Sequence, residues 1–363
     1  MSHSLYIFTI SYEGTLFSYE FKIDEGVITP FFNCKDHVGR IKAVHATADG
    51  LVLTSGEDEN IKVYNYLKRK KLSNIYGTSG VALKLLSTPA FTLSCHENGA
   101  ICIEGKKDFA IYHRLKVFKD SCIDFDLHPS NKLMVCLNNK QRFAVWNLSM
   151  CSVVFHKKIK VQAQMVRFLD DERLIILTPS SIYCFNIRLM TVTNEIKAVE
   201  GTKINDCVII RDPKPLVAIG CENGHVYFYP QENFNESSED ESPLYIGFKA
   251  YNYRVKKVAV AGSYMVTVST EGDISIWDIS DIQGAKDLSG GVVIESYSAL
   301  YEYKVSSRLV GLSCIMKSDH QAYNANGQKA SQENTAEAVE RAREPRLKHK
   351  IQKYRKIRRN LNN

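Results

Sequence analysis

Apolar and polar residues alternate in short runs along most of the chain, and polar turns separate these runs. Ile61 and Val63 flank Lys62 in one run, and Ile274 and Ile276 flank Ser275 in another. A period of two places the apolar side chains on one face of a β-strand and the polar side chains on the other. The segments before these strands contain Asp, Glu, Asn and Gly, which tolerate tight reversals. The pattern therefore predicts an all-β protein.

The run at residues 269–279 ends on a Trp-Asp pair, and weaker copies of it recur through the chain. The position of the tryptophan is occupied in turn by Tyr19, Tyr64, Glu104, Trp146, Phe185, Tyr229 and Trp277, at separations of 39–48 residues. A repeat of about 40–45 residues with four strands and a Trp-Asp ending is typical of one blade of a WD-repeat β-propeller. Seven copies predict a seven-bladed ring in which each sheet covers a face of its neighbour.

The two ends of this predicted ring are expected to share a blade. Residues 4–22 have the pattern of a hairpin that lacks preceding strands of its own. We expect this hairpin to complete a sheet that residues 308–315 begin, so that the propeller spans residues 1–316. Residues 248–256 are expected to open the sixth blade.

Several polar residues occupy the positions at which many WD repeats keep a hydrogen-bond network. In the first blade these residues are His37, Ser55, Asp58 and Tyr64, and Tyr64 keeps the bulk of a tryptophan without its indole donor. Trp146 and Trp277 hold the same closing position in the third and sixth blades. His37 with Asp58 could also form a catalytic pair, but a structural tether is the favoured interpretation.

No pattern for catalysis or for metal binding emerges from the chain. It lacks a phosphate-binding Gly-rich loop, a nucleophile elbow and a His-Glu-x-x-His zinc motif. Its 10 cysteines are scattered without a Cys-x-x-Cys pair, which favours reduced, buried thiols in an intracellular protein. No secretory leader and no apolar run of about 20 residues is visible. We expect a non-enzymatic protein without a cofactor, a metal, a small-molecule substrate or a membrane partner.

An acidic, Ser-rich insertion at residues 232–242 separates the fifth and sixth blades. Without an apolar period it is expected to form an exposed, mobile loop. Ser237 and Ser238 precede three acidic residues, a context that acidophilic kinases accept. An unmodified solvated loop is an equally good interpretation.

The C-terminal segment has a different character. Residues 317–340 are polar and are expected to form a flexible linker. Residues 341–363 carry ten basic residues and a single acid, Glu344, so the net charge of +7 resides in this tail and the rest of the chain is close to neutral. Pro345 at a helix start and apolar residues at steps of three and four predict a basic amphipathic helix. The ten basic residues are Arg341, Arg343, Arg346, Lys348, Lys350, Lys353, Arg355, Lys356, Arg358 and Arg359.

Such a tail has several possible uses. Its cations can pair with phosphates and give sequence-tolerant affinity for RNA, and the same run can serve as a nuclear import signal. Its apolar stripe could instead bind in the groove of a partner protein or on a membrane surface. A solvated charge run is the remaining alternative.

Five blocks of the sequence resemble the PAK-interacting protein family, whose yeast relative is Mak-eleven. Beyond the N-terminal hairpin, these blocks are residues 39–64, 125–148, 248–250 with 254–256, and 308–312. The resemblance spans about residues 4–316. It implies a nucleolar, non-catalytic assembly factor of the large ribosomal subunit, and the animal members are also regarded as negative regulators of p21-activated kinases.

On this basis we expect a nuclear and nucleolar scaffold that binds pre-ribosomal proteins through the propeller and ribosomal RNA through the tail. Arg254 and Lys256, at the start of the sixth blade, are the residues expected to form a protein-binding face. The alternative hypothesis is an adaptor that negatively regulates a kinase of the p21-activated type. The sequence does not identify the direct partners or the face of the ring that they use.

Overall fold

The computed structural model describes residues 3–76, 80–199, 202–212, 215–235, 243–284, 291–294 and 296–319. The chain divides into two units, Met1–Ser318 and Asp319–Asn363. The first unit is the propeller. The predicted linker beyond residue 319 and the basic tail at 341–363 lie outside the described residues, as do Ser237 and Ser238.

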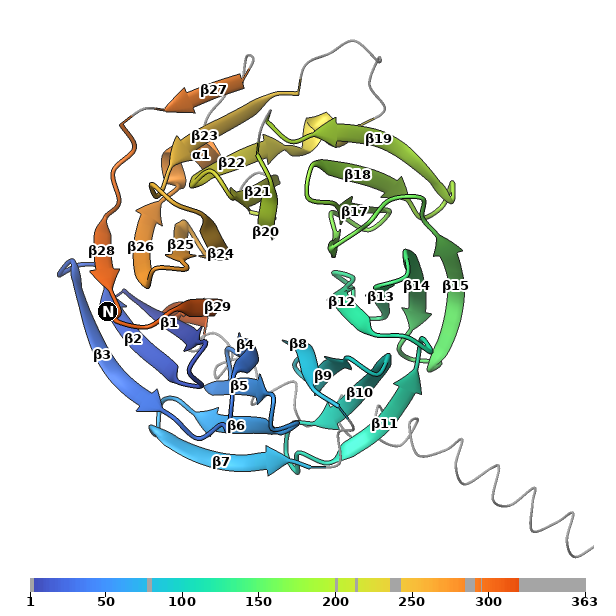
Figure 1. The fold of residues 1–363 in the computed structure, drawn as a ribbon, viewed down its shortest axis with the longest axis horizontal. Helices are drawn as coiled ribbons and strands as arrows, with labels where there is room; N and C mark the ends of the chain where they lie inside the picture. The colour runs from blue at the N-terminus through green and yellow to red at the C-terminus, as the bar shows by residue number, and fades with distance from the viewer. Residues whose placement is uncertain are drawn as a thin grey trace, which may run out of the picture. The chain divides into compact units, whose positions relative to one another are not determined.

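Seven antiparallel sheets surround a central axis, which confirms the predicted seven-bladed propeller (Figure 1). In each of the first three blades the strands run from the inside of the ring to its rim in chain order. Blade one contains β4 (Ile41–Ala46), β5 (Leu51–Gly56), β6 (Ile61–Asn65) and β7 (Lys70–Ile75). Blade two contains β8 (Ala82–Ser87), β9 (Phe91–His96), β10 (Ala100–Gly105) and β11 (Ile111–Lys116). Blade three contains β12 (Cys122–Leu127), β13 (Leu133–Asn138), β14 (Arg142–Asn147) and β15 (Ser152–Lys158).

The next three blades follow the same plan, and blade five gains a fifth strand at the rim. Blade four contains β16 (Met165–Phe168), β17 (Arg173–Leu177), β18 (Ser181–Asn186) and β19 (Thr191–Lys197). Blade five contains β20 (Ile204–Ile210), β21 (Leu216–Cys221), β22 (His225–Pro230), β23 (Tyr245–Lys249) and a fifth, parallel strand, β27 (Gly291–Ile294). Blade six contains β24 (Val255–Ala261), β25 (Tyr264–Ser269), β26 (Asp273–Asp278) and β28 (Tyr301–Lys304). A short helix, α1 (Ser280–Gly284), follows β26.

Blade seven joins the beginning of the propeller to its end. Its inner strand is β29 (Leu309–Met316), and β1 (Ser4–Ser11), β2 (Leu16–Lys22) and β3 (Val27–Cys34) complete the sheet. The pairing of β1 with β29 runs from Leu5 opposite Met316 to Ser11 opposite Leu309. Backbone hydrogen bonds therefore close the ring, and only short sheet edges remain, at the channel and at the rim.

A recurring β-bulge marks the repeat in the structure. In five blades the pairing of the third strand with the outer strand shifts immediately before the residue in the tryptophan position, as between Val63 and Tyr64 and between Val145 and Trp146. Because a bulge inserts one unpaired residue and increases the local twist, its recurrence shows that the residues aligned by the sequence period are structurally equivalent.

Both faces of each central strand are covered, because the neighbouring blades pack on them. The polar residues that the alternation assigned to the second face are therefore buried as well: Lys62 and Ser275 are 6% and 1% exposed. The hydrophobic clusters lie between adjacent blades, for example between blades six and seven around Leu309 and Val268. The core is thus a ring of inter-blade contacts.

Two boundaries differ from the sequence prediction. Phe248 and Lys249 end β23, the outer strand of blade five, and blade six begins only at Val255. The predicted mobile insertion begins with a 3-10 helix at Gln231–Phe234, because Phe234 is buried and its side chain fixes the segment to blades four and five.

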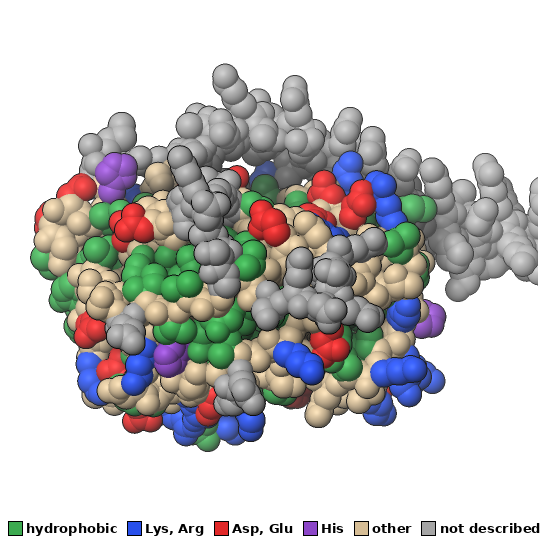
Figure 2. Space-filling view, turned by 90° about the horizontal axis from the view of Figure 1, so that it is seen from above, with side chains coloured by type: hydrophobic (Ala, Val, Ile, Leu, Met, Phe, Trp, Pro, Cys, Tyr) green, Lys and Arg blue, Asp and Glu red, His purple; other side chains and the backbone are tan. Residues whose placement is uncertain are grey.

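The rim of the ring is partly apolar. Figure 2 views the rim from the side on which β19, β23 and β27 lie, and hydrophobic side chains gather over its middle. The outer strands on this side leave Val192, Val292 and Val293 at 42–49% exposure. Among the described helices, none is long and apolar enough to cross a membrane.

Candidate interaction face

One face of the ring is built from paired turns and loops. In each blade a turn joins the second strand to the third, and the chain leaving the outer strand passes over that turn on its way to the next blade. Four of these turns contain a glycine with positive φ, namely Gly14, Gly99, Gly224 and Gly272, and the carbonyls of the last three accept from the overlying loop. A Cβ on Gly272 would lie 2.1 Å from the Val305 carbonyl oxygen. We call this surface the loop face.

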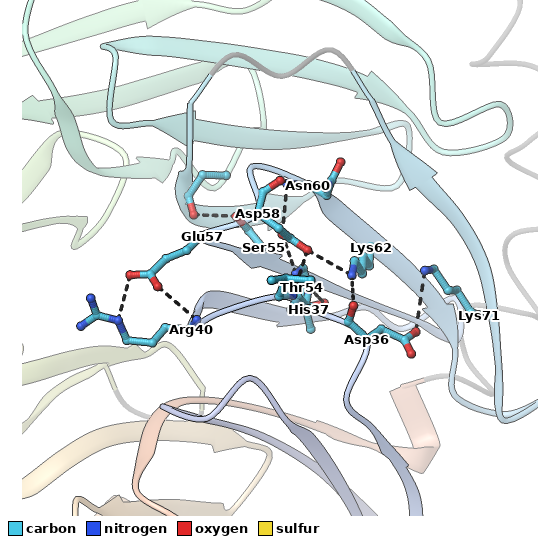
Figure 3. Close-up of polar contacts among 12 residues, drawn as sticks. Asp36, His37, Arg40, Thr54, Ser55, Glu57, Asp58, Asn60, Lys62 and Lys71 are labelled. Atoms are coloured by element: carbon cyan, nitrogen blue, oxygen red, sulfur yellow. Dashed lines mark hydrogen bonds and ion pairs between the residues drawn. The ribbon is translucent and has the colours of Figure 1, made fainter.

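The loop entering blade one is held by a network of hydrogen bonds around His37 (Figure 3). His37 Nδ1 lies 2.8 Å from Asp58 Oδ1, and its Nε2 lies 2.8 Å from Thr54 Oγ1. The carboxylate can only accept, so Nδ1–H donates to Asp58 and Nε2 accepts from the Thr54 hydroxyl. Lys62 Nζ pairs with Asp58 at 3.1 Å. The network is fully occupied internally, which favours a structural role for His37 and Asp58.

The predicted membership of this network needs one correction. Thr54 occupies the place assigned to Ser55, whose hydroxyl instead donates to the Ala82 carbonyl in blade two at 2.8 Å. The strand register explains the difference: Thr54 and Tyr64 point to one face of the sheet, and Ser55 points to the other. Tyr64 is buried, and its hydroxyl donates to Asp36 at 3.3 Å.

The two closing tryptophans are buried but differ in their hydrogen bonds. Trp277 Nε1 donates to Thr267 Oγ1 at 2.9 Å, and the hydroxyl of Tyr251 shares the same threonine at 2.8 Å. Trp146 Nε1 has no partner among the described residues. Cys136 holds the threonine position in that blade, and a thiol is a weak acceptor.

A second recurring bulge positions lysines at the mouth of the central channel. Where β24 pairs with β25, Val255 faces Ser269 and Lys257 faces Val268, so Lys256 is the unpaired bulge residue. Lys42 holds the same place in blade one. A bulge re-aims the side chain of the extra residue, so both lysines occupy the loop-face end of an inner strand. Sequence reasoning selected Lys256 but missed Lys42.

Three arginines join these lysines from neighbouring blades. The Tyr12 ring, at the tip of blade seven, lies 4.7 Å from Arg40 Cζ and 5.7 Å from Arg308 Cζ. Arg254 pairs with Glu222 at 3.4 Å. Because Tyr12 also donates its backbone N–H to the Arg308 carbonyl at 2.9 Å, the aromatic ring and both guanidinium groups are held together.

Positive charge exceeds negative charge in this cluster, which consists of Arg40, Lys42, Arg254, Lys256, Lys257 and Arg308. Glu57 pairs with Arg40 and Lys42, and Asp206 pairs with Lys257. Lys256 and Arg308 have no carboxylate partner within the described part of the chain. Burial, followed by the charges of Lys257, Arg254 and Arg308, lowers the pKa of Lys256. We call these six residues the basic cluster.

Lys84 and Arg167, elsewhere along the channel, share one carboxylate. Asp124 accepts from Lys84 Nζ at 2.8 Å and from Arg167 Nη1 at 2.5 Å, and it also accepts the Val166 backbone N–H at 2.8 Å. This carboxylate connects blades two, three and four. Each cation at this place therefore has a carboxylate partner, unlike Lys256 and Arg308 in the basic cluster.

A cleft of about 630 Å³ lies at the opposite ends of the strands, between blades four and five. Its charged groups are largely satisfied by each other: Asp170 Oδ2 accepts from Arg173 Nε at 2.7 Å and from Gln231 Nε2 at 2.9 Å. A partner would have to break these contacts, so the basic cluster is the stronger candidate for recognition.

The basic cluster has the chemistry of an anion-binding surface. Arginines present forked donors to phosphate or carboxylate, and Tyr12 supplies an aromatic face. Arg254 and Lys256, the two residues selected from the sequence, lie together here. Arg40, Arg308 and Tyr12 were missed because only the closure of blade seven brings them to the same mouth.

The fold is that of a WD40 β-propeller. The solved WD40 propeller domain of Doa1 matches with a TM-score of 0.57 at 13% identity, covering 72% of this chain and 85% of that chain. No family model matches the sequence.

The chain is also similar in sequence to several curated proteins. The chain is 24% identical to a p21-activated protein kinase-interacting protein 1-like from Xenopus laevis, over 96% of this chain and 91% of the relative. It is 22% identical to Shk1 kinase-binding protein 15 from Schizosaccharomyces pombe, over 74% and 76%. It is 24% identical to Protein MAK11 from Saccharomyces cerevisiae, over 69% and 70%. The resemblance inferred from the sequence blocks is thereby confirmed.

Proposed function

We propose that this protein is a non-catalytic scaffold in the assembly of the large ribosomal subunit. In this account the propeller binds pre-ribosomal proteins and RNA phosphates at the loop face, and the basic segment at residues 341–363 adds affinity for ribosomal RNA. The protein acts in the nucleus, within the nucleolus. The similarity to Protein MAK11 and its family supports the assignment.

The basic cluster is the observation that carries the proposal beyond the family. Lys256 and Arg308 lack a carboxylate partner among the described residues, although the channel carboxylates nearby are paired. A surface that keeps uncompensated cations beside an aromatic ring suits a phosphate backbone or an acidic segment of a ribosomal protein. The second cationic element, the C-terminal segment, carries ten basic residues.

A kinase-regulating adaptor is the second candidate function. Two of the relatives carry names that describe binding to, or interaction with, a kinase. The basic cluster would then recognise an acidic surface of the kinase, and the protein would not associate stably with ribosomal precursors.

Affinity purification of the tagged full-length chain separates the two functions. The bound material is assayed for precursor RNA of the large subunit and, by immunoblotting, for a p21-activated kinase. Enrichment of the RNA over a tag-only control supports the scaffold. Enrichment of the kinase without the RNA overturns it in favour of the adaptor.

A further inference from the structure

Blade two contains a buried polar cluster at the place where blades three and six keep their closing tryptophan. Ser94 and His96 on β9 and Cys102 and Glu104 on β10 share one face, because Ser94 lies directly opposite Cys102 and the others follow at steps of two. The side chains of His96, Cys102 and Glu104 are at most 1% exposed. Three residue types that bind metal ions are thus sealed inside a β-sheet protein.

His96 is oriented like a metal-binding histidine. Its Nδ1 lies 2.9 Å from the Gly80 carbonyl oxygen, which can only accept, so Nδ1 carries the proton. The lone pair of Nε2 therefore points into the cluster, where it lies 2.9 Å from Ser94 Oγ. Metal-binding histidines commonly donate their second N–H to a carbonyl or carboxylate in this way.

Glu104 supplies a second, independent sign that the cluster lacks a partner. One carboxylate oxygen accepts from the Ser94 hydroxyl, and the other, Oε2, is buried without a hydrogen-bond partner among the described residues. A buried, half-satisfied carboxyl group is costly unless an ion or another partner completes it.

One ligand atom from each of His96, Cys102 and Glu104 lies within 4.8 Å of the other two. Zinc bonds of about 2.0–2.3 Å require ligand atoms roughly 3.2–3.8 Å apart, so modest side-chain movement brings the three atoms to binding distance. The mixture of imidazole, thiolate and carboxylate is a typical zinc donor set.

We propose that His96 Nε2, Cys102 Sγ and the Glu104 carboxylate bind one Zn²⁺ ion inside blade two. The Ser94 hydroxyl, which contacts both His96 and Glu104, stands at the fourth position. Binding releases the thiol proton and any proton on Glu104 to solvent, and the ion then crosslinks β9 to β10 where the indole of a tryptophan would otherwise pack. The sequence did not predict this site, because its ligands do not form a Cys-x-x-Cys motif.

The experiment measures metal in the purified full-length chain. Because the cluster is sealed, the metal is supplied during synthesis: cells are grown with Zn²⁺ in one culture and with Co²⁺ in another, and the protein is purified without a polyhistidine tag. Elemental analysis after dialysis against a chelating resin gives the zinc content. The cobalt protein is examined for the near-ultraviolet charge-transfer band that requires a cobalt–thiolate bond.

The proposal predicts about one zinc per chain and a cobalt–thiolate band that Cys102→Ser abolishes. Cys151→Ser, which removes a half-buried thiol in blade three, leaves both signals intact. Glu104→Gln keeps the shape and the contact with Ser94 but removes the charge, so it folds and yet retains less than a tenth of the zinc. Its circular dichroism confirms the fold.

Two results would overturn the site. A folded wild-type chain without zinc and without the cobalt band would show that the cluster binds no metal. A band that survives Cys102→Ser would assign the metal to another thiol.

Discussion

The side chain in the closing position determines which hydrogen bonds hold each blade together. Trp277 donates to Thr267, Tyr64 reaches Asp36, and Glu104 accepts from Ser94. Where the acceptor is lost, as at Cys136 beside Trp146, the indole N–H has no partner among the described residues. The repeat therefore keeps an aromatic side chain at this position in six of the seven blades, while its hydrogen bonds vary.

His37 makes the stability of the propeller depend on pH. Burial lowers the pKa of His37 below its ordinary value of 6.5, although Asp58 opposes the shift. As the pH falls below 6.5, the unfolded chain takes up a proton at this histidine before the folded chain does. The stabilisation that neutral His37 contributes is therefore complete above pH 6.5 and decreases as the pH falls below that value.

The variant His37→Gln is expected to be less stable than the wild type at pH 7.5, and the difference in their free energies of unfolding should be smaller at pH 5.5. This difference decreases by at most about 1.4 kcal/mol, because pH 5.5 lies one unit below the ordinary pKa of histidine. Urea unfolding at the two pH values measures it. The exposed His3→Gln serves as the control, and a difference between wild type and His37→Gln that stays constant with pH would contradict the account.

Gly272 is required by both its conformation and its surroundings. Its φ is 94°, and a Cβ would lie 2.1 Å from the Val305 carbonyl oxygen. Gly272→Ala is therefore expected to lose about 2–3 kcal/mol in thermal or urea unfolding. Gly26 also has a positive φ, but no atom lies within 4 Å of the place that a Cβ would occupy there, so Gly26→Ala should lose only roughly 1 kcal/mol. Equal losses at the two sites would show that the overlying loop can move aside.

The residue-level predictions succeeded where the period alone decided them. Tyr64 and Trp277 were found because the repeat spacing identifies their position. The sequence analysis chose Ser55 in place of Thr54. Val52 pairs with Tyr64, so Thr54, two residues further along the strand, lies on the same face as Tyr64 and Ser55 does not. The cluster around Glu104 could not be predicted, because the identity of a residue in the closing position does not reveal its buried partners.

At the level of strands, the bulges and the inter-blade carboxylates set the geometry of the ring. The bulge near the start of an inner strand directs Lys42 and Lys256 to the channel mouth. In blades three and five, the residue that follows the bulge is an aspartate, and its carboxylate accepts a backbone N–H of the next blade. Asp124 accepts from Val166, and Asp206 accepts from Val258. These contacts fix the angle between neighbouring sheets.

Asp124→Asn tests this connection. The substitution keeps the shape but leaves Lys84 and Arg167 without their carboxylate, and removing one partner of a buried ion pair costs about 3 kcal/mol or more. Asp126→Asn on the same strand is the matched control, because Asp126 accepts the Phe168 N–H and makes no ion pair among the described residues. Chemical denaturation should separate the two variants, and equal stabilities would contradict a role for the ion pairs.

The number of blades and the sharing of one blade by the two ends followed from the sequence, because repeat length and an orphan hairpin determine them. The boundary between blades five and six did not. The segment around Phe248 has the alternation of any strand, and only its pairing with Val226 in β22 shows that it is the outer strand of blade five. Likewise, no pattern in the sequence of β27 predicts that it pairs in parallel with β23.

At the scale of the whole molecule, positive charge is concentrated in two places. The C-terminal segment accounts for the net charge of the chain, and the basic cluster gives the loop face its local surplus. Two cationic elements in one chain raise its affinity for a large polyanionic particle through multivalency, and this affinity should decrease with salt. The kinase-adaptor hypothesis predicts no such partner.

Sucrose-gradient sedimentation of the tagged full-length protein tests the scaffold most directly, at low and high salt. The double variant Lys256→Glu with Arg308→Glu removes the unpaired cations of the basic cluster, and Lys70→Glu with Lys158→Glu makes the same charge change on exposed rim strands. We predict that the wild type and the rim variant sediment with precursors of the large subunit at low salt, and that the cluster variant shifts toward the top. A wild-type protein that remains at the top as free protein at low salt would contradict the account.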